Sequence, residues 1–81
     1  MKPVKVIRFG AISASVFENS IDTESGAKSM LTVNLQRRYR DSDGQWKSNN
    51  SFTLTELPSA IEVLRRAMDF VASEQIDDLT S

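Results

Sequence analysis

Residues 31–54 read LTVNLQRRYRDSDGQWKSNNSFTL, and this stretch predicts a long β-hairpin. Leu31, Val33 and Leu35 alternate with polar side chains, which is the period of a strand with one buried face. The segment DSDG at 41–44 supplies turn chemistry, and Gly44 can adopt a positive φ. We therefore expect strands over 30–39 and 46–54, joined at a tight tip.

Basic and aromatic side chains gather around that expected tip. They are Arg37, Arg38, Tyr39, Arg40, Trp46 and Lys47, with Asn49 as a nearby polar donor and acceptor and Phe17 as a further aromatic. Cations neutralise phosphates and aromatic rings stack on bases, so this mixture is typical of a nucleic-acid surface. Two alternatives stay open here. The arginines could form a merely solvated hairpin tip, and Trp46 and Phe17 could be ordinary core residues.

Composition narrows the classes of function. The 81 residues contain neither Cys nor His, which excludes a disulfide framework, a thiolate zinc site and most catalytic constellations. We expect no enzyme activity, no cofactor and no metal. The segment at Asp41, Asp43 and Gly44 faintly resembles a calcium loop, but it lacks the closing Glu and is interpreted as a turn. One small domain over 1–75 with a short acidic tail at 76–81 is expected.

Charge is distributed unevenly along the chain. Residues 1–53 carry eight Lys or Arg against five Asp or Glu, or +3, whereas residues 54–81 carry two against six, or −4, which together give the net −1. A local positive potential can attract phosphates even on a weakly anionic molecule. No apolar run is long enough to span a bilayer, so we expect a soluble, cytoplasmic protein, nucleoid-associated if the source is bacterial.

The remaining segments predict two more strands and one helix. Residues 4–9 and 11–18 are expected to form two strands, or one strand bent at Gly10, with Ile12, Ala14 and Val16 on one side of the second segment. A polar loop is expected over 19–27. An amphipathic helix over 57–74 follows, started either by Thr55 as N-cap or by a capping box from Ser59 to Glu62. The expected class is α+β, a curved four-stranded antiparallel sheet followed by one helix.

The apolar stripe of that helix is wider than one small sheet needs. Its surplus predicts a dimer interface made by Leu64, Met68, Phe70 and Val71. A small domain buries only about 60% of its unfolded surface, so extra burial by dimerisation is plausible. The alternative, that Met68 and Phe70 only cap the core of their own chain, also stays open.

Three segments together, FGAISASVFEN, LTVNLQRRYRDSDGQWK and SFTLTELPSAIEVLRRA, give the chain a family resemblance over residues 6–72. It resembles the single-stranded-DNA-binding domain of the transcriptional coactivator positive cofactor four and its small bacterial and phage relatives. The resemblance implies ββββα subunits that dimerise through their helices and bind single strands or melted duplex on curved sheets. It also implies a base-stacking role for Tyr39 and basic contacts from Lys28 and Lys47.

The chain departs from that family at basic positions. Ala11, Ser13 and Gln36 stand where the coactivator carries basic residues, so affinity could be lower or the footprint displaced. The leading hypothesis is a homodimer that binds single-stranded DNA, with RNA or melted duplex as further candidate ligands. It would act in transcription regulation, replication, recombination or repair, where transcription or replication proteins are its candidate partners. The alternative is a protein-interaction module that uses acidic residues of the helix and tail. These are Glu56, Glu62, Asp69, Glu74, Asp77 and Asp78.

Overall fold

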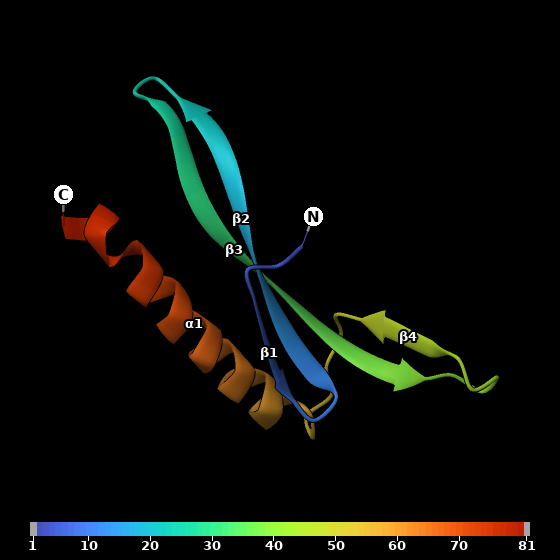
Figure 1. Ribbon diagram of the computed structural model, residues 1–81. Coiled ribbons are helices and arrows are strands. Elements are labelled where there is room, and N and C mark those ends of the chain that lie inside the picture. Colours follow the sequence, from blue (N-terminus) through green and yellow to red (C-terminus); the bar gives the residue numbers. More distant parts are fainter. Residues whose placement is uncertain (1, 81) are drawn as a thin grey trace.

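The computed structural model describes residues 2–80, with side chains over 2–74. Its elements are β1 (Lys5–Phe9), β2 (Ile12–Thr23), β3 (Gly26–Arg40), β4 (Trp46–Asn49) and α1 (Leu57–Thr80). The strands form one antiparallel sheet in the order β1-β2-β3-β4, followed by the single helix (Figure 1). The α+β class and the ββββα order expected from the sequence are confirmed.

Strands β2 and β3 make a ribbon that is longer than the sequence predicts. Their pairing runs without a break from Ile12 opposite Arg37 to Thr23 opposite Gly26, so the polar loop expected over 19–27 is wrong. Only Glu24 and Ser25 form the turn, and Gly26 takes a φ of +114°. The outer half of the ribbon is exposed on both sides. Its strands therefore lack the apolar alternation by which a half-buried strand is recognised.

Strand β4 is shorter than expected. It pairs with β3 only from Trp46 opposite Arg40 to Asn49 opposite Arg37, and the chain then leaves the sheet, so the strand expected over 46–54 is wrong beyond Asn49. Phe52 packs against the core cluster, whereas Leu54 is 81% exposed. Packing of the partly buried Phe52 against the core takes the place of the strand pairing that its sequence pattern suggested.

The helix begins with a cap that differs from both expected ones. The backbone N–H of Thr53 donates to Glu56 Oε1 at 2.9 Å, and the Thr53 hydroxyl donates to the same oxygen at 2.9 Å. In a capping box the acidic side chain at the third helical position accepts from the N–H of the capping residue, as Glu56 does here from Thr53, six residues before the Ser59–Glu62 candidate. Glu62 instead pairs with Arg65 and Arg66. The helix continues through Thr80, past the expected end at 74, and the side chains of the expected acidic tail lie outside the described residues.

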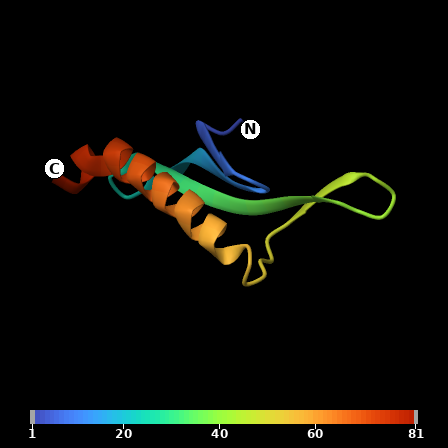
Figure 2. The same ribbon diagram turned by 90° about the horizontal axis from the view of Figure 1, so that it is seen from below.

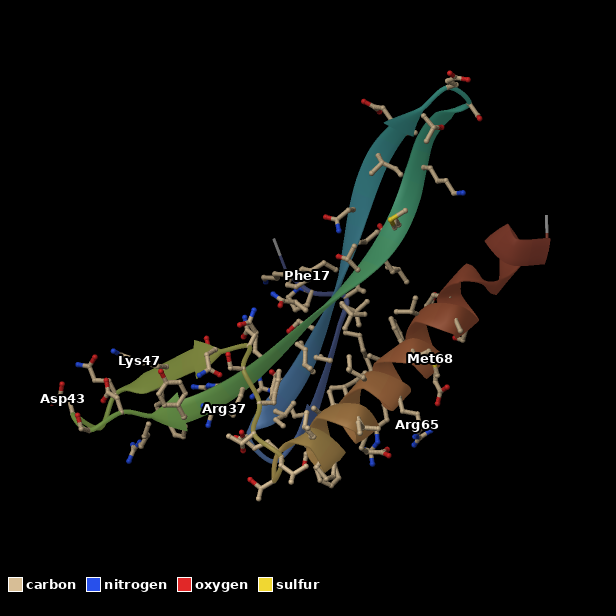
Figure 3. All side chains as sticks on the ribbon, turned by 180° about the vertical axis from the view of Figure 1, so that it is seen from behind. Phe17, Arg37, Asp43, Lys47, Arg65 and Met68 are labelled. Atoms are coloured by element: carbon tan, nitrogen blue, oxygen red, sulfur yellow. The ribbon has the colours of Figure 1, made fainter. Side chains whose placement is uncertain are left out.

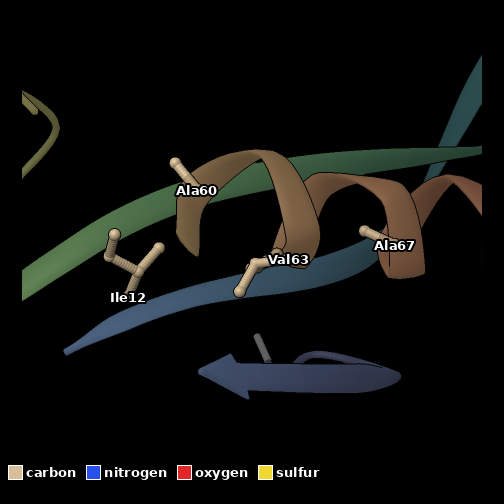
Figure 4. Packing of buried hydrophobic residues seen from close by; sticks show 5 residues of the cluster. Ile12, Ala60, Val63 and Ala67 are labelled. Carbon is tan, nitrogen blue, oxygen red and sulfur yellow. The ribbon is translucent and has the colours of Figure 1, made fainter. Parts of the chain in front are cut away.

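The hydrophobic core lies between β2 and the first half of α1 (Figure 4). Its buried members are Ile12, Ala14 and Val16 of β2 and Ala60, Val63 and Ala67 of α1. Three of these six are alanines, which lets the helix approach the sheet closely but buries little apolar area. Two cation–π contacts connect β1 to the helix. Lys5 Nζ lies 5.9 Å from the centre of the Phe70 ring, and the guanidinium carbon of Arg66 lies 5.6 Å from the centre of the Phe9 ring.

The molecule is elongated rather than round. Its radius of gyration is 15.4 Å, against about 12 Å for a compact chain of this length. The outer part of the β2–β3 ribbon extends in one direction and the β3–β4 hairpin in another, and the helix lies along one side of the strands (Figures 1 and 2). Helix α1 contacts β1, β2 and β3. Both projecting parts therefore keep large exposed surfaces.

Candidate nucleic-acid interface

The strand register sorts the expected site residues onto two faces of the sheet. Ile12 and Ala14 point toward the helix, and cross-strand partners share a face, so the register identifies the side of every strand residue. The face toward the helix, here called the helix-side face, carries Arg37, Tyr39, Lys47 and Asn49; the opposite face, here called the open face, carries Arg38, Arg40, Trp46, Phe17 and Lys28. The sequence treats these residues as one cluster, but the structure separates them.

Trp46 is the centre of the open-face site. Its side chain is 58% exposed, so the core-packing alternative does not apply to it. The guanidinium carbons of Arg38 and Arg40 lie 4.9 and 5.1 Å from the centre of its ring. Within the described residues neither arginine makes an ion pair with a carboxylate. A single ring thus stands among cations whose charge is not compensated, which is what an unpaired base and its phosphates require.

Arg8 joins this cluster from β1. It lies opposite Ser13, and a hollow of about 170 Å³ is lined by Arg8, Gly10, Ala11, Ile12, Ser13, Arg38 and Trp46. We call Arg8, Arg38, Arg40 and Trp46 the open-face cluster. Sequence reasoning missed Arg8. The signal was present, because pairing the strands tightly across Gly10, whose φ is +62°, brings Arg8 beside Ser13 on the polar side of β2.

The charges of the helix-side face are already paired. Arg37 Nη1 lies 3.0 Å from Glu56 Oε2, and the Asn49 amide oxygen can accept from Arg37 Nη2 at 3.1 Å while its nitrogen donates to the Ser51 carbonyl at 3.2 Å. The Arg37 guanidinium also lies 5.1 Å from the Tyr39 ring. Arg37 and Asn49 therefore hold β3, β4 and the start of the helix together rather than standing free for a ligand.

The hairpin tip is organised by Asp41. Its Oδ1 accepts from the backbone N–H groups of Asp43 and Gln45, both at 2.9 Å, and its Oδ2 lies 3.4 Å from Lys47 Nζ. The bond from Gln45, followed by those from Asp43 and Lys47, lowers the pKa of Asp41. Gly44 has the positive φ expected of it, +78°. Lys47 and Asp43 mark this tip in Figure 3.

Phe17 and Lys28 lie farther along the open face. Phe17 is half-buried opposite Thr32, and Lys28 is opposite Ile21 on the exposed ribbon. Arg38 follows Lys28 by ten residues along β3, a distance of about 33 Å at the usual rise per residue. Most side chains in the interval are uncharged and polar, and they are Ser13, Ser15, Asn19, Thr32, Asn34 and Gln36; the apolar Met30 lies opposite Asn19 on the same face.

The helix carries an exposed apolar stripe beside its buried one. Ile61, Leu64 and Met68 are 65%, 43% and 61% exposed, and an apolar hollow of about 420 Å³ is lined by Val33, Leu64, Ala67, Met68, Val71 and Ala72. Figure 3 shows Met68 and Arg65 projecting from the helix. Of the four residues expected at a dimer interface, Leu64, Met68 and Val71 share this hollow. Phe70 lies instead on the intramolecular side, under Lys5 of β1.

Comparisons with protein families, with curated proteins and with solved structures found no match to this chain. The helix described here is not apolar enough along any stretch to cross a bilayer.

Proposed function

We propose that this chain is a non-enzymatic, homodimeric protein that binds single-stranded nucleic acid on the open face of its sheet. The observation that carries the proposal is the exposed Trp46 ring beside the guanidinium groups of Arg38 and Arg40, neither of which has a carboxylate partner among the described residues. The resemblance to the positive cofactor four domain points the same way. A role in transcription, replication, recombination or repair follows from that class of ligand.

Binding combines stacking with charge neutralisation. A base stacks on Trp46 while Arg8, Arg38 and Arg40 neutralise the neighbouring phosphates and release counterions. The strand continues over the uncharged polar side chains toward Phe17 and Lys28. Phosphate contacts and stacking do not depend on base identity, so most of the affinity is independent of sequence. This footprint is displaced from the one that the resemblance implies, because Tyr39 and Lys47 lie on the other face.

The exposed apolar stripe supports a homodimer. Half of the buried core residues are alanines, and the larger apolar side chains Ile61, Leu64 and Met68 are left exposed to water. The same stripe on a second copy of the chain could pack against them in a symmetric dimer. Pairing two chains also doubles the positive charge of the sheet region. The acidic-helix alternative is less well supported, since Glu62 and Asp69 already pair with Arg65 and Glu56 with Arg37.

The test is fluorescence anisotropy with a labelled thymidine oligonucleotide and with a duplex of the same length. It is done at low and at physiological salt, on protein whose mass is measured by light scattering. We expect a dimer that prefers the single strand and whose affinity falls with salt. Absence of binding at low salt, by folded protein, would overturn the proposal and redirect attention to protein partners of the helix.

A further inference from the structure

A second hollow on the open face is built almost wholly from amides. It has a volume of about 350 Å³ and lies where β4 leaves the edge of β3, lined by Asn34, Gln36, Ser48, Asn49 and Asn50. We call it the amide pocket. Among the described residues no cationic or acidic side chain lines it, in contrast to the neighbouring hollow, which Arg8 and Arg38 line. Its chemistry is therefore hydrogen bonding without charge.

The amides of this pocket are available. Asn49 is engaged with Arg37, but within the described residues no hydrogen bond occupies the side chains of Asn34, Gln36, Ser48 or Asn50. Each of these four is exposed. A side-chain amide presents one acceptor and two donors, so the pocket offers paired donors and acceptors to whatever lies over it.

The pocket directly adjoins the open-face cluster. Ser48 is the cross-strand partner of Arg38, and Gln36 precedes Arg38 by two residues on the same face, which places their Cα atoms about 7 Å apart. A strand that stacks one base on Trp46 and lays its phosphate on Arg38 therefore carries a neighbouring base over Gln36 and Asn34. The pocket has no charged side chain among the described residues to hold a phosphate, so its amides suit a base edge better than the backbone of such a strand.

We propose that the amide pocket reads this neighbouring base and prefers adenine. Adenine carries a donor beside an acceptor on its Hoogsteen edge, N6 with N7, and again on its Watson–Crick edge, N6 with N1; the amides of Asn and Gln complement such pairs. The Hoogsteen edge of guanine presents two acceptors and suits a cation, which the pocket lacks. Thymine, cytosine and guanine each present a donor beside an acceptor on the Watson–Crick edge alone, so adenine is the base with two edges that an amide complements. The inference rests on the proposed function, because it requires a single strand on the open face.

The experiment compares two oligonucleotides that differ at two bases. One is a labelled twelve-residue thymidine strand of about the size such sheets cover, and the other carries two central adenines. Wild-type full-length chain is expected to bind the adenine-containing strand at least about fivefold more tightly, the lower end of the discrimination given by one bidentate amide. The variants Gln36→Met and Asn34→Ala should bring the ratio of the two affinities to about one.

Gln45→Met is the matched control, because it removes an amide near the hairpin tip without touching the pocket, and its ratio should stay that of the wild type. Equal binding of both strands by wild-type protein, with affinity still dependent on salt, would overturn the adenine preference and leave the proposed function standing. A preference that survives both pocket variants would also overturn it. Failure to bind either strand would overturn the proposed function itself. Circular dichroism of each variant establishes that the fold is retained.

Discussion

Arg37 and Glu56 are joined by an ion pair of 3.0 Å that connects β3 to the turn before the helix. The same carboxylate accepts from the backbone and the hydroxyl of Thr53. One acidic side chain therefore links the end of the sheet to the first turn of α1. Arg37 is also the residue of β3 farthest from the hairpin tip that pairs with β4, opposite Asn49, so the ion pair holds the connecting segment close to the point where the two strands part.

Replacing Glu56 should weaken the fold without touching the open face. Glu56→Ala leaves the Thr53 N–H without its capping partner and Arg37 without its carboxylate, so we expect the thermal midpoint to fall by several degrees. Thermal unfolding followed by circular dichroism measures this. Glu62→Ala, which loses ion pairs but no backbone cap, is the control and should shift the midpoint less; equal shifts would contradict the role of the cap.

Stability should decline in acid. Hydrogen bonds from Arg65 and then Arg66 lower the pKa of Glu62 to about 2, and Thr53 followed by Arg37 holds the pKa of Glu56 below its usual range. A carboxyl group whose folded pKa is depressed stabilises the fold above its unfolded pKa, about 4.3. That stabilisation is lost as the pH falls through the folded value.

Urea unfolding between pH 7 and pH 2 tests this dependence. The midpoint should be nearly constant above about pH 5 and then decrease. In Glu62→Gln the decrease should be shallower, because one of the depressed groups is gone. A midpoint that rises on acidification would contradict the assignment of these carboxylates.

Trp46 should contribute more to single-strand binding than Tyr39. Stacking of one base is worth about 1 to 3 kcal/mol, so Trp46→Ala should weaken binding by roughly fivefold or more, and Trp46→Phe by less. Quenching of the fluorescence of Trp46, the one tryptophan of the chain, reports stacking directly. Tyr39→Ala tests the opposite face. A greater loss in that variant would mean that the strand binds the helix-side face.

Arg38 and Arg40 should account for part of the salt dependence. Each phosphate contact adds about 0.7 to the slope of log affinity against log salt for a single strand, so Arg38→Ala with Arg40→Ala should reduce the slope by about 1.4. The matched control is Arg65→Ala with Arg66→Ala, which removes the same charge from the helix. If both pairs reduce the slope equally, the effect is one of net charge and not of the open face.

Met68 should be needed for the dimer. Met68→Glu places a charge in the exposed apolar stripe, where a second chain would have to bury it unpaired, so light scattering should show a monomer. Ser73→Glu adds the same charge on another side of α1 and should leave the dimer intact. A dimer that persists in Met68→Glu would mean that the chains meet elsewhere.

The sequence predicts the faces of the central strands well because those faces differ in solvent exposure. Leu31 and Leu35 alternate with polar residues, as do Ile12 and Ala14, and the register confirms both patterns. The alternation of apolar and polar residues does not identify the outer half of the β2–β3 ribbon, because both of its faces are exposed to water and neither requires apolar side chains. It fails again after Asn49, because Phe52 reaches the core from a connecting segment.

The candidate site was only partly predictable for a related reason. Adjacent residues of a strand point to opposite faces, so the run from Arg37 to Arg40 divides into two sets that composition cannot distinguish. Which set is free depends on Glu56 and Asp41, whose pairing with Arg37 and Lys47 is tertiary. Arg8 can be assigned to the open-face cluster only once β1 is paired with β2 across the turn at Gly10.

The order of the strands also bears on how the chain assembles. Every strand pairs with its neighbour in the sequence, so the sheet can form by successive hairpin closures over short loops, which is the fast route for an antiparallel sheet. The apolar side of β2 is buried only where α1 packs on it, because the helix supplies the other half of the core. Any state of the chain in which α1 is undocked therefore exposes Ile12 and Val16 to water, and with them an apolar strand surface on which copies of the chain can aggregate.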